Sequence, residues 1–180
     1  MRLNSTEVCQ LKELLMSCTN TITCMSFFMK QVKNQELSDI LSRQFPMHVE
    51  DYNMKALFLK EENGPQNDLS IPEQIGLQAD LSVGVPMEPV TPNTDTEEFN
   101  DRQIATNYLL TLKRAGKEYA GAAMEAAHPK LREFLKDAFT LSCNHAYEVW
   151  EWMLKNEYYD NCPEEPSKIE KVANSFNVVE

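Results

Sequence analysis

Apolar residues recur at three- and four-residue steps along the first 60 residues, which is the period of an α-helix. Polar residues fill the positions between them, so each segment has one face suited to a core and one suited to water. The inward positions predicted for the first helix and then the second are Val8, Leu11, Leu15, Cys18, Ile22, Met25, Phe28 and Val32, followed by Leu37, Leu41, Phe45, His48, Tyr52, Ala56 and Leu59. This part of the chain therefore predicts a helical hairpin.

Local signals mark where these two helices begin, turn and change direction. Ser5 or Thr6 is expected to cap the first helix, and Glu7 in its first turn suits the positive helix end. The polar residues 34–35 predict a tight turn between the helices. Pro46 falls inside the second segment and is expected to kink that helix or split it, since an interior proline costs about 3 kcal/mol.

The same plan returns after residue 98. Asn100 or Asp101 is expected to cap a third helix, and His128-Pro129 to mark the turn into a fourth, with Pro129 in its first turn. The predicted inward positions of the third and fourth helices are Ile104, Tyr108, Leu112, Ala115, Tyr119, Ala123 and Ala126, followed by Leu131, Leu135, Ala138, Leu141, His145, Val149 and Trp152. A second hairpin is therefore predicted.

The segment between the hairpins has a different composition. Residues 61–98 hold five of the nine prolines, three of the five glycines (Gly64, Gly76 and Gly84) and nine acidic residues without a Lys or Arg, which predicts a loop rather than a regular element. Two hairpins joined by one long crossover predict an all-α, ferritin-like four-helix bundle. The expected organisation is a single domain over 1–180, made of a hairpin at 5–62, the crossover at 63–98, a hairpin at 99–159 and a tail at 160–180.

Charge narrows the classes of protein to consider. The net charge is −11, and it divides into +1 for 1–60, −9 for 61–98, 0 for 99–158 and −3 for 159–180. An acidic chain without a basic cluster does not suit phosphate-tracking nucleic-acid binders. We find no apolar run as long as a membrane span and no signal-peptide pattern near the first residue, so synthesis in a cytoplasm is expected.

Five irregularly spaced cysteines favour reduced thiols over a disulfide framework. Cys18, Cys24 and Cys143 lie on or beside apolar stripes, where a free thiol behaves as a small hydrophobic group. Cys9 and Cys162 lie near the ends of the sequence and are expected to be exposed, where oxidation could cross-link neighbouring chains.

The histidines and acidic residues do not form the ligand pattern of a ferritin-like metal site. Ferritin-like metal sites use inward Glu residues and paired Glu-x-x-His motifs, but the one Glu-x-x-His here, Glu125 to His128, lies at a helix end. We therefore predict no metal and no cofactor. If the chain does bind metal, the candidates are the residues on or near inward faces, namely His48, Glu118, His145 and Glu148. The alternative for both histidines is a structural place in the core, and for Glu118 an ion pair at the surface.

No phosphate-binding glycine loop, nucleophile elbow or dinucleotide fingerprint occurs, so no enzyme is indicated and no catalytic residue is predicted. Gly116 and Gly121 give the third helix a thin side, which indicates close helix packing, with a small-ligand site as the alternative. The aromatic residues Tyr147, Trp150, Tyr158 and Tyr159 predict either an interface or a surface covered by the crossover and tail.

Residues 99–159 resemble the Coat F family of bacterial spore coat proteins. The resemblance rests on Asp101-Arg102, Leu109-Leu110, Lys113, Tyr119, Glu125 with Pro129, Arg132, His145, Met153 and Tyr158-Tyr159. Family members usually end this region with a Gly-Trp-Tyr-like sequence, whereas this chain has Glu157-Tyr158-Tyr159. The missing glycine removes the usual left-handed helix stop.

The resemblance implies a non-enzymatic structural or assembly protein of the spore coat, made in the mother cell and deposited on the forespore. Its partners would be other coat proteins or further copies of itself, without nucleic-acid binding or membrane insertion. The acidic crossover is where we expect a basic partner to dock. The alternative function is a metal-binding or oxidoreductase bundle with a non-standard site.

Overall fold

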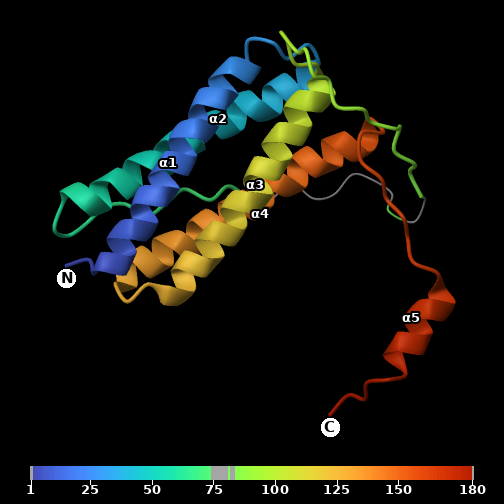
Figure 1. The fold of residues 1–180 in the computed structure, drawn as a ribbon. Coiled ribbons are helices and arrows are strands. Elements are labelled where there is room, and N and C mark those ends of the chain that lie inside the picture. The colour runs from blue at the N-terminus through green and yellow to red at the C-terminus, as the bar shows by residue number, and fades with distance from the viewer. Residues whose placement is uncertain (1, 74–80, 82–83, 180) are drawn as a thin grey trace.

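The chain is described by a computed structural model, in which residues 2–73, 81 and 84–179 are placed. Its helices are α1 (Ser5–Phe28), α2 (Gln35–Lys60), α3 (Asp101–Glu125), α4 (Pro129–Lys155) and the short α5 (Pro166–Ala173). The four long helices form one bundle, with α1 and α3 toward the viewer and α2 and α4 behind them (Figure 1). This confirms the predicted all-α bundle of two hairpins.

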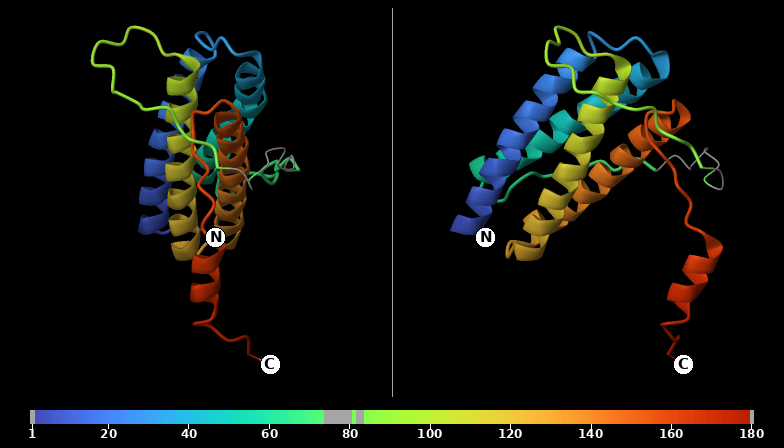
Figure 2. Two further views of the ribbon diagram at one scale, coloured as in Figure 1. Left: turned by 90° about the vertical axis from the view of Figure 1, so that its right-hand side faces the viewer. Right: turned by 45° about the vertical axis from the view of Figure 1, so that its right-hand side comes forward.

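Each hairpin packs along the other, with α1 beside α3 and α2 beside α4. The α1–α2 turn meets the start of α3, where Asp101 accepts hydrogen bonds from the backbone N–H groups of Lys33 and Asn34 at 2.8 and 3.0 Å. The α2 end lies instead near the start of α4, where Lys130 Nζ donates to the carbonyl of Pro65. The end of α2 and the start of α3, which the crossover joins, therefore lie at opposite ends of the bundle (Figure 2).

Side-chain caps begin all four long helices. Asn4, Asn34, Asn100 and His128 each accept a hydrogen bond from a backbone N–H in the first turn, and Pro129 occupies the first turn of α4. The predictions of Asn100 and of the His128-Pro129 turn are confirmed. The prediction of Ser5 or Thr6 is wrong: Asn4 caps α1, because Glu7 lies three residues after Asn4 and completes a capping box.

Two apolar clusters fill the bundle, one toward each end. Between them the inward positions turn polar: Cys18 and Thr21 follow Leu14 on α1, and Ser142 and His145 precede Val149 on α4. The predicted inward faces of α3 and α4 are otherwise confirmed. On α1 the face is rotated slightly, so that Leu14 is buried while Val8 is 42% exposed.

The inward face of α2 differs from the prediction after Pro46. The buried residues there are Asp51, Met54, Lys55 and Phe58, in place of the predicted Tyr52, Ala56 and Leu59, whereas the predicted His48 does face inward, against Tyr108 and His145. Leu59 is 42% exposed. The apolar pattern missed this face because two of its members are charged, and a charged residue is buried only with a partner. Pro46 does not split the helix, which continues from Gln35 to Lys60.

The C-terminal end of α4 forms a left-handed stop without a glycine. Glu157 adopts a left-handed conformation with φ 59°. The N–H of Tyr158 donates to the carbonyl of Met153 at 2.8 Å, and that of Glu157 to the carbonyl of Leu154 at 3.1 Å. These are the two bonds of a Schellman motif, made here with glutamate where glycine is usual.

The crossover and the tail meet beside the bundle. Val85 and Asn161 exchange two backbone hydrogen bonds at 2.9 and 3.1 Å, and Arg102 of α3 donates to the carbonyl of Glu88. Tyr158 packs against the buried Trp152 with ring centroids 5.7 Å apart and the rings inclined by 58°, so two members of the aromatic group contact each other. Gly76 of the crossover lies outside the described residues. None of the helices placed here is long and apolar enough to cross a bilayer.

Candidate functional site

A cluster of buried polar side chains joins three helices in the middle of the bundle. Lys55 and Asp51 form an ion pair one turn apart on α2, and both are almost completely buried. Tyr119 of α3 donates to Asp51 Oδ2 at 2.8 Å and accepts from Lys55 Nζ at 3.0 Å. Cys18 of α1 lies 3.2 Å from Asp51 Oδ2 and 3.1 Å from Lys55 Nζ. We call these four residues the central cluster.

In the central cluster, Cys18 and Tyr119 stay uncharged beside the ion pair of Asp51 and Lys55. Burial, and then the charge of Asp51, raises the pKa of Cys18 to about 11. Burial raises the pKa of Tyr119 well above its usual value as well, again with Asp51 as the second cause. Cys18 therefore stays a thiol at neutral pH and lacks the thiolate that nucleophilic or metal-binding chemistry requires. The prediction that Cys18 packs as a simple hydrophobic group is wrong, because its sulfur lies among three polar groups.

A second chain of hydrogen bonds continues from the interior to the surface. His48 Nε2 lies 2.7 Å from the hydroxyl of Tyr108, which in turn donates to Gln44 Oε1 at 2.7 Å. Gln44 Nε2 donates to Glu148 Oε2 at 2.6 Å, and Arg43 pairs with the other oxygen of Glu148. Because the Tyr108 hydroxyl donates to Gln44, it accepts from His48, which places a proton on His48 Nε2.

The structure brings His48 and His145 together. Their ring centroids are 5.3 Å apart, one ring edge facing the other. Burial lowers the pKa of His48 to about 4, and burial together with the charges of His48 and Arg43 lowers that of His145 to about 3. Both imidazoles are thus neutral at physiological pH. His145 Nε2 lies 3.3 Å from Met47 Sδ, while its Nδ1 is buried without a hydrogen-bond partner among the placed residues.

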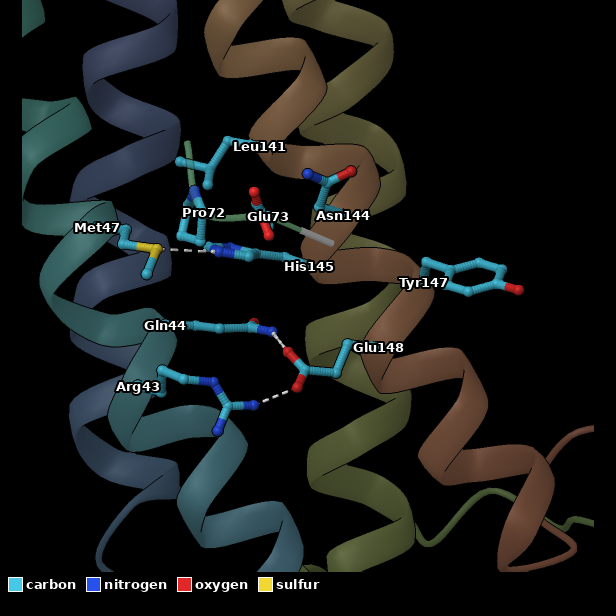
Figure 3. A pocket seen from close by; sticks show the side chains of 10 residues that line it. All are labelled: Arg43, Gln44, Met47, Pro72, Glu73, Leu141, Asn144, His145, Tyr147 and Glu148. Carbon is cyan, nitrogen blue, oxygen red and sulfur yellow. Dashed lines mark hydrogen bonds and ion pairs between the residues drawn. The ribbon is translucent and has the colours of Figure 1, made fainter. Parts of the chain in front are cut away.

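A pocket of about 250 Å³ opens between α2 and α4 beside this histidine. Figure 3 shows Arg43 and Gln44 reaching from α2 to Glu148 on α4, whereas Tyr147 points away from the pocket. The residues that line it are Arg43, Gln44, Met47, Pro72, Glu73, Leu141, Asn144, His145, Tyr147 and Glu148. Pro72 and Glu73 belong to the crossover, which therefore forms part of the wall.

Of the remaining metal candidates, Glu148 lines the pocket beside His145, whereas Glu118 lies elsewhere. Glu118 lies on the surface of α3, 3.6 Å from Arg114, as expected for an ion pair at the surface. Glu148 lies on the flank of α4 and is occupied by Arg43 and Gln44. Glu125 accepts a hydrogen bond from Gln10, and His128 caps α4. Over residues 2–73, 81 and 84–179, no group of three or more His, Cys, Asp or Glu side chains is arranged to hold a metal ion.

The thin side of α3 serves packing at one position. A methyl group added at Gly116 would lie 3.7 Å from Ser142 on α4, and Ser142 Oγ donates to the carbonyl of Leu112 at 2.9 Å. Gly121 faces open space. The helices thus approach closely at Gly116, but 3.7 Å is an ordinary van der Waals distance, so a methyl group would fit there.

The sequence did not predict the hydrogen bonds and the ion pair of the interior. These join Gln44, Asp51 and Lys55 of α2 to other side chains, including Tyr108 and Tyr119 of α3. A signal was present on α2, because residues 44, 51, 55 and 58 share one helical face. Recognising that face as buried requires its partners, which come from helices far away in the sequence.

Comparison with known proteins supports the resemblance found in the second hairpin. Residues 100–163 match the Coat F domain family. The spore coat protein F-like protein YhcQ of Bacillus subtilis (strain 168) is 24% identical over 164 residues, which cover 88% of this chain and 74% of that protein.

A solved structure from Bacillus halodurans C-125, provisionally named a spore coat protein, has a similar fold. It superposes with a TM-score of 0.67 at 10% sequence identity and covers 92% of this chain and 96% of the other. At this identity the similarity establishes the fold. It extends beyond the 100–163 match to both hairpins.

Proposed function

We propose that the protein is a structural or assembly component of the bacterial spore coat, because residues 100–163 match the Coat F domain family. The observation that carries the proposal is the agreement between this match and the similarity to YhcQ, which spans 88% of the chain and so includes the first hairpin. On this proposal the protein is made in the mother cell and deposited on the forespore.

The protein works through contacts with other coat proteins or with copies of itself. The acidic crossover supports this role, since its described part is largely exposed and offers carboxylates to a basic partner. The same acidity disfavours nucleic acid as a partner. The proposed role involves no insertion into a membrane.

The proposed role is not enzymatic. Its support lies in the interior, where Asp51, Lys55 and Tyr119 bind one another, and where burial keeps Cys18 in its unreactive thiol form. Groups that bind one another in this way stabilise a bundle, whereas a reacting group must be free to meet a substrate.

The experiment is to follow a fluorescent fusion of the full chain through sporulation in the source organism, and to assay purified coats for the untagged protein. We expect a ring around the forespore and recovery of the chain in the coat fraction. A chain that stays dispersed in growing cells, is absent from purified coats and is produced independently of sporulation would refute the proposal.

The second candidate is a metal-binding bundle, and the observation that favours it is the contact between His48 and His145. Both rings are neutral, which is the form that binds metal. Elemental analysis of protein purified from the source organism decides between the two. Stoichiometric iron or manganese, lost in a His48→Gln/His145→Gln variant and kept in a Glu118→Gln variant, would favour this candidate.

A further inference from the structure

The C-terminal helix α5 carries an apolar face that the described part of the chain leaves exposed. Ile169 and Val172 lie three residues apart on α5 and are 57% and 55% exposed, and Phe176, which follows the helix, is 76% exposed. No residue of α5 is buried. The helix stands clear of the bundle in Figure 1 and in both views of Figure 2. An amphipathic helix usually buries such a face against a partner.

The bundle has an open groove of matching character between α1 and α3. It encloses about 560 Å³. Leu14 and Ala122 form its floor, and Met16, which is 59% exposed, lies at its side. Cys9 and Asn20 mark its two ends on α1.

The dimensions of helix and groove agree. The eight residues of α5 span about 12 Å at 1.5 Å per residue, and the groove follows α1 for about 16 Å between Cys9 and Asn20. The side chains of α5 can therefore lie along the groove in a single layer.

The charges beside the two apolar surfaces are also complementary. On α5 the apolar face is flanked by Lys168 on one side and by Glu170 on the other. The rims of the groove carry the exposed Glu13 on α1 and the exposed ion pair of Arg114 and Glu118 on α3. Lys168 pairs with Glu164 within its own tail, and the groove carries one more carboxylate than cation, so the charge match is between Lys168 and Lys171 of α5 and the carboxylates of Glu13 and Glu118.

We propose that α5 of one molecule docks into the α1–α3 groove of a second copy of this chain. The tail favours a second copy over the same chain because Asn161 is held to Val85 of the crossover, and only residues 162–165 connect it to α5. The five steps from Asn161 to Pro166 reach at most about 18 Å, and α5 extends away from the helices α1 and α3 (Figures 1 and 2). Each chain then both donates a helix and accepts one.

This inference deepens the proposed function by naming one partner and its surface. It rests on the proposed function only for its place in the cell. An experiment with purified protein tests it whether or not the chain lies in a spore coat, so the two proposals can fail separately.

The test uses two full-length variants that damage opposite halves of the contact. Ile169→Asp places a charge on the apolar face of α5, and Met16→Asp places one at the groove. The matched controls are Ser167→Asp, on the opposite side of α5, and Leu110→Asp, at an exposed apolar position of α3 that does not line the groove. Glu13→Lys is a second groove variant, and circular dichroism verifies that every variant is folded.

Molar mass is measured by analytical ultracentrifugation over increasing protein concentration. We expect the wild type and both controls to associate, and Ile169→Asp and Met16→Asp each to weaken association by at least tenfold. A mixture of these two variants should form a one-to-one complex, since one supplies an intact groove and the other an intact helix.

Two results would overturn the proposal. The first is a wild-type chain that remains monomeric up to about 100 μM, which would include the case of α5 docking in its own groove. The second is a mixture of Ile169→Asp and Met16→Asp that forms no complex although both are folded. Association that persists unchanged in Ile169→Asp, Met16→Asp and Glu13→Lys would place the contact elsewhere and equally refute it.

Discussion

The carboxylate of Glu7 accepts a hydrogen bond of 2.7 Å from the backbone N–H of His128, which joins the start of α1 to the turn between α3 and α4. The same carboxylate accepts from the N–H groups of Ala127 and Asn4. It is only 1% exposed. One side chain thus satisfies donors at the start of the first hairpin and at the turn of the second, and His128 lies 121 residues after Glu7 in the chain.

Replacing Glu7 by Gln should therefore destabilise the protein. The amide keeps one acceptor oxygen but loses the second and the negative charge, so we expect a loss of about 2 kcal/mol in the free energy of unfolding. Glu13→Gln, at an exposed position of the same helix, should change it by less than about 0.5 kcal/mol. Urea unfolding followed by circular dichroism measures both, and equal values for the two variants would contradict this role of Glu7.

The Glu7 contribution should also depend on pH. Burial alone would raise the pKa of Glu7, but the hydrogen bonds from Asn4, His128 and Ala127 outweigh burial and hold it below 4.5. The folded chain thus keeps this carboxylate charged at pH values where the unfolded chain protonates it. The stabilisation is complete above pH 4.5 and is lost as the pH falls through the folded pKa. The difference in stability between wild type and Glu7→Gln should shrink over that range.

The two buried histidines predict acid sensitivity at higher pH. Their folded pKa values of about 4 and about 3 lie below the ordinary 6.5, so the unfolded chain binds protons that the folded chain does not. Stability is therefore complete above pH 6.5 and falls as the pH drops, by about 3–5 kcal/mol between pH 7 and pH 4.5. Unfolding midpoints measured across this range test the sign.

The slope of the free energy of unfolding against pH identifies which residues cause this acid sensitivity. His48→Gln and His145→Gln should each remove about one proton from the pH dependence of unfolding, whatever they do to stability at pH 7. His128→Asn keeps a helix-capping residue and serves as the matched control. A slope that is unchanged in the His48→Gln/His145→Gln variant would show that other groups are responsible.

The central cluster predicts a strong coupling between Asp51 and Lys55. Lys55→Met leaves a buried carboxylate without its cation and should cost about 3–5 kcal/mol. Asp51→Leu combined with Lys55→Met removes both charges and should recover most of that loss. The exposed pair Glu133 and Lys136 provides the comparison, since Lys136→Met should cost less than about 1 kcal/mol. A double-mutant cycle in urea measures the coupling, and additive losses at Asp51 and Lys55 would argue against it.

The left-handed residue at the end of α4 offers a stabilising substitution. A non-glycine residue in this conformation costs about 1–2 kcal/mol, and part of the gain from glycine is offset by the greater entropy of the unfolded chain. Glu157→Gly should therefore raise stability by about 0.5–1 kcal/mol, seen as a higher Tm. Asn156→Gly is the neighbouring control, and it should lower the Tm because Asn156 has φ −96° and its side chain bonds the carbonyl of Trp152. A lower Tm for Glu157→Gly would contradict the Schellman interpretation.

Most of the local structure could be predicted from the sequence because it depends on neighbours a few residues apart. The spacing of apolar residues predicted both hairpins, and Asn100 and His128-Pro129 marked two of the helix starts. Even the missed cap had a signal of this kind, since Asn4 stands three residues before Glu7 as a capping box requires. Three capping residues in a row, Asn4, Ser5 and Thr6, obscured it.

The sequence by itself thus determined the four helices, the long acidic crossover and the resemblance in the second hairpin. Only the tertiary structure decided that Asp51 and Lys55 face inward, because burying a charge is favourable only when partners surround it. Those partners, Cys18 and Tyr119, come from two other helices. The same holds for Glu7, which looked like a surface residue at a helix start until the turn at His128 was folded against it. Apolar burial follows a periodicity that one segment carries alone, whereas polar burial depends on contacts between segments.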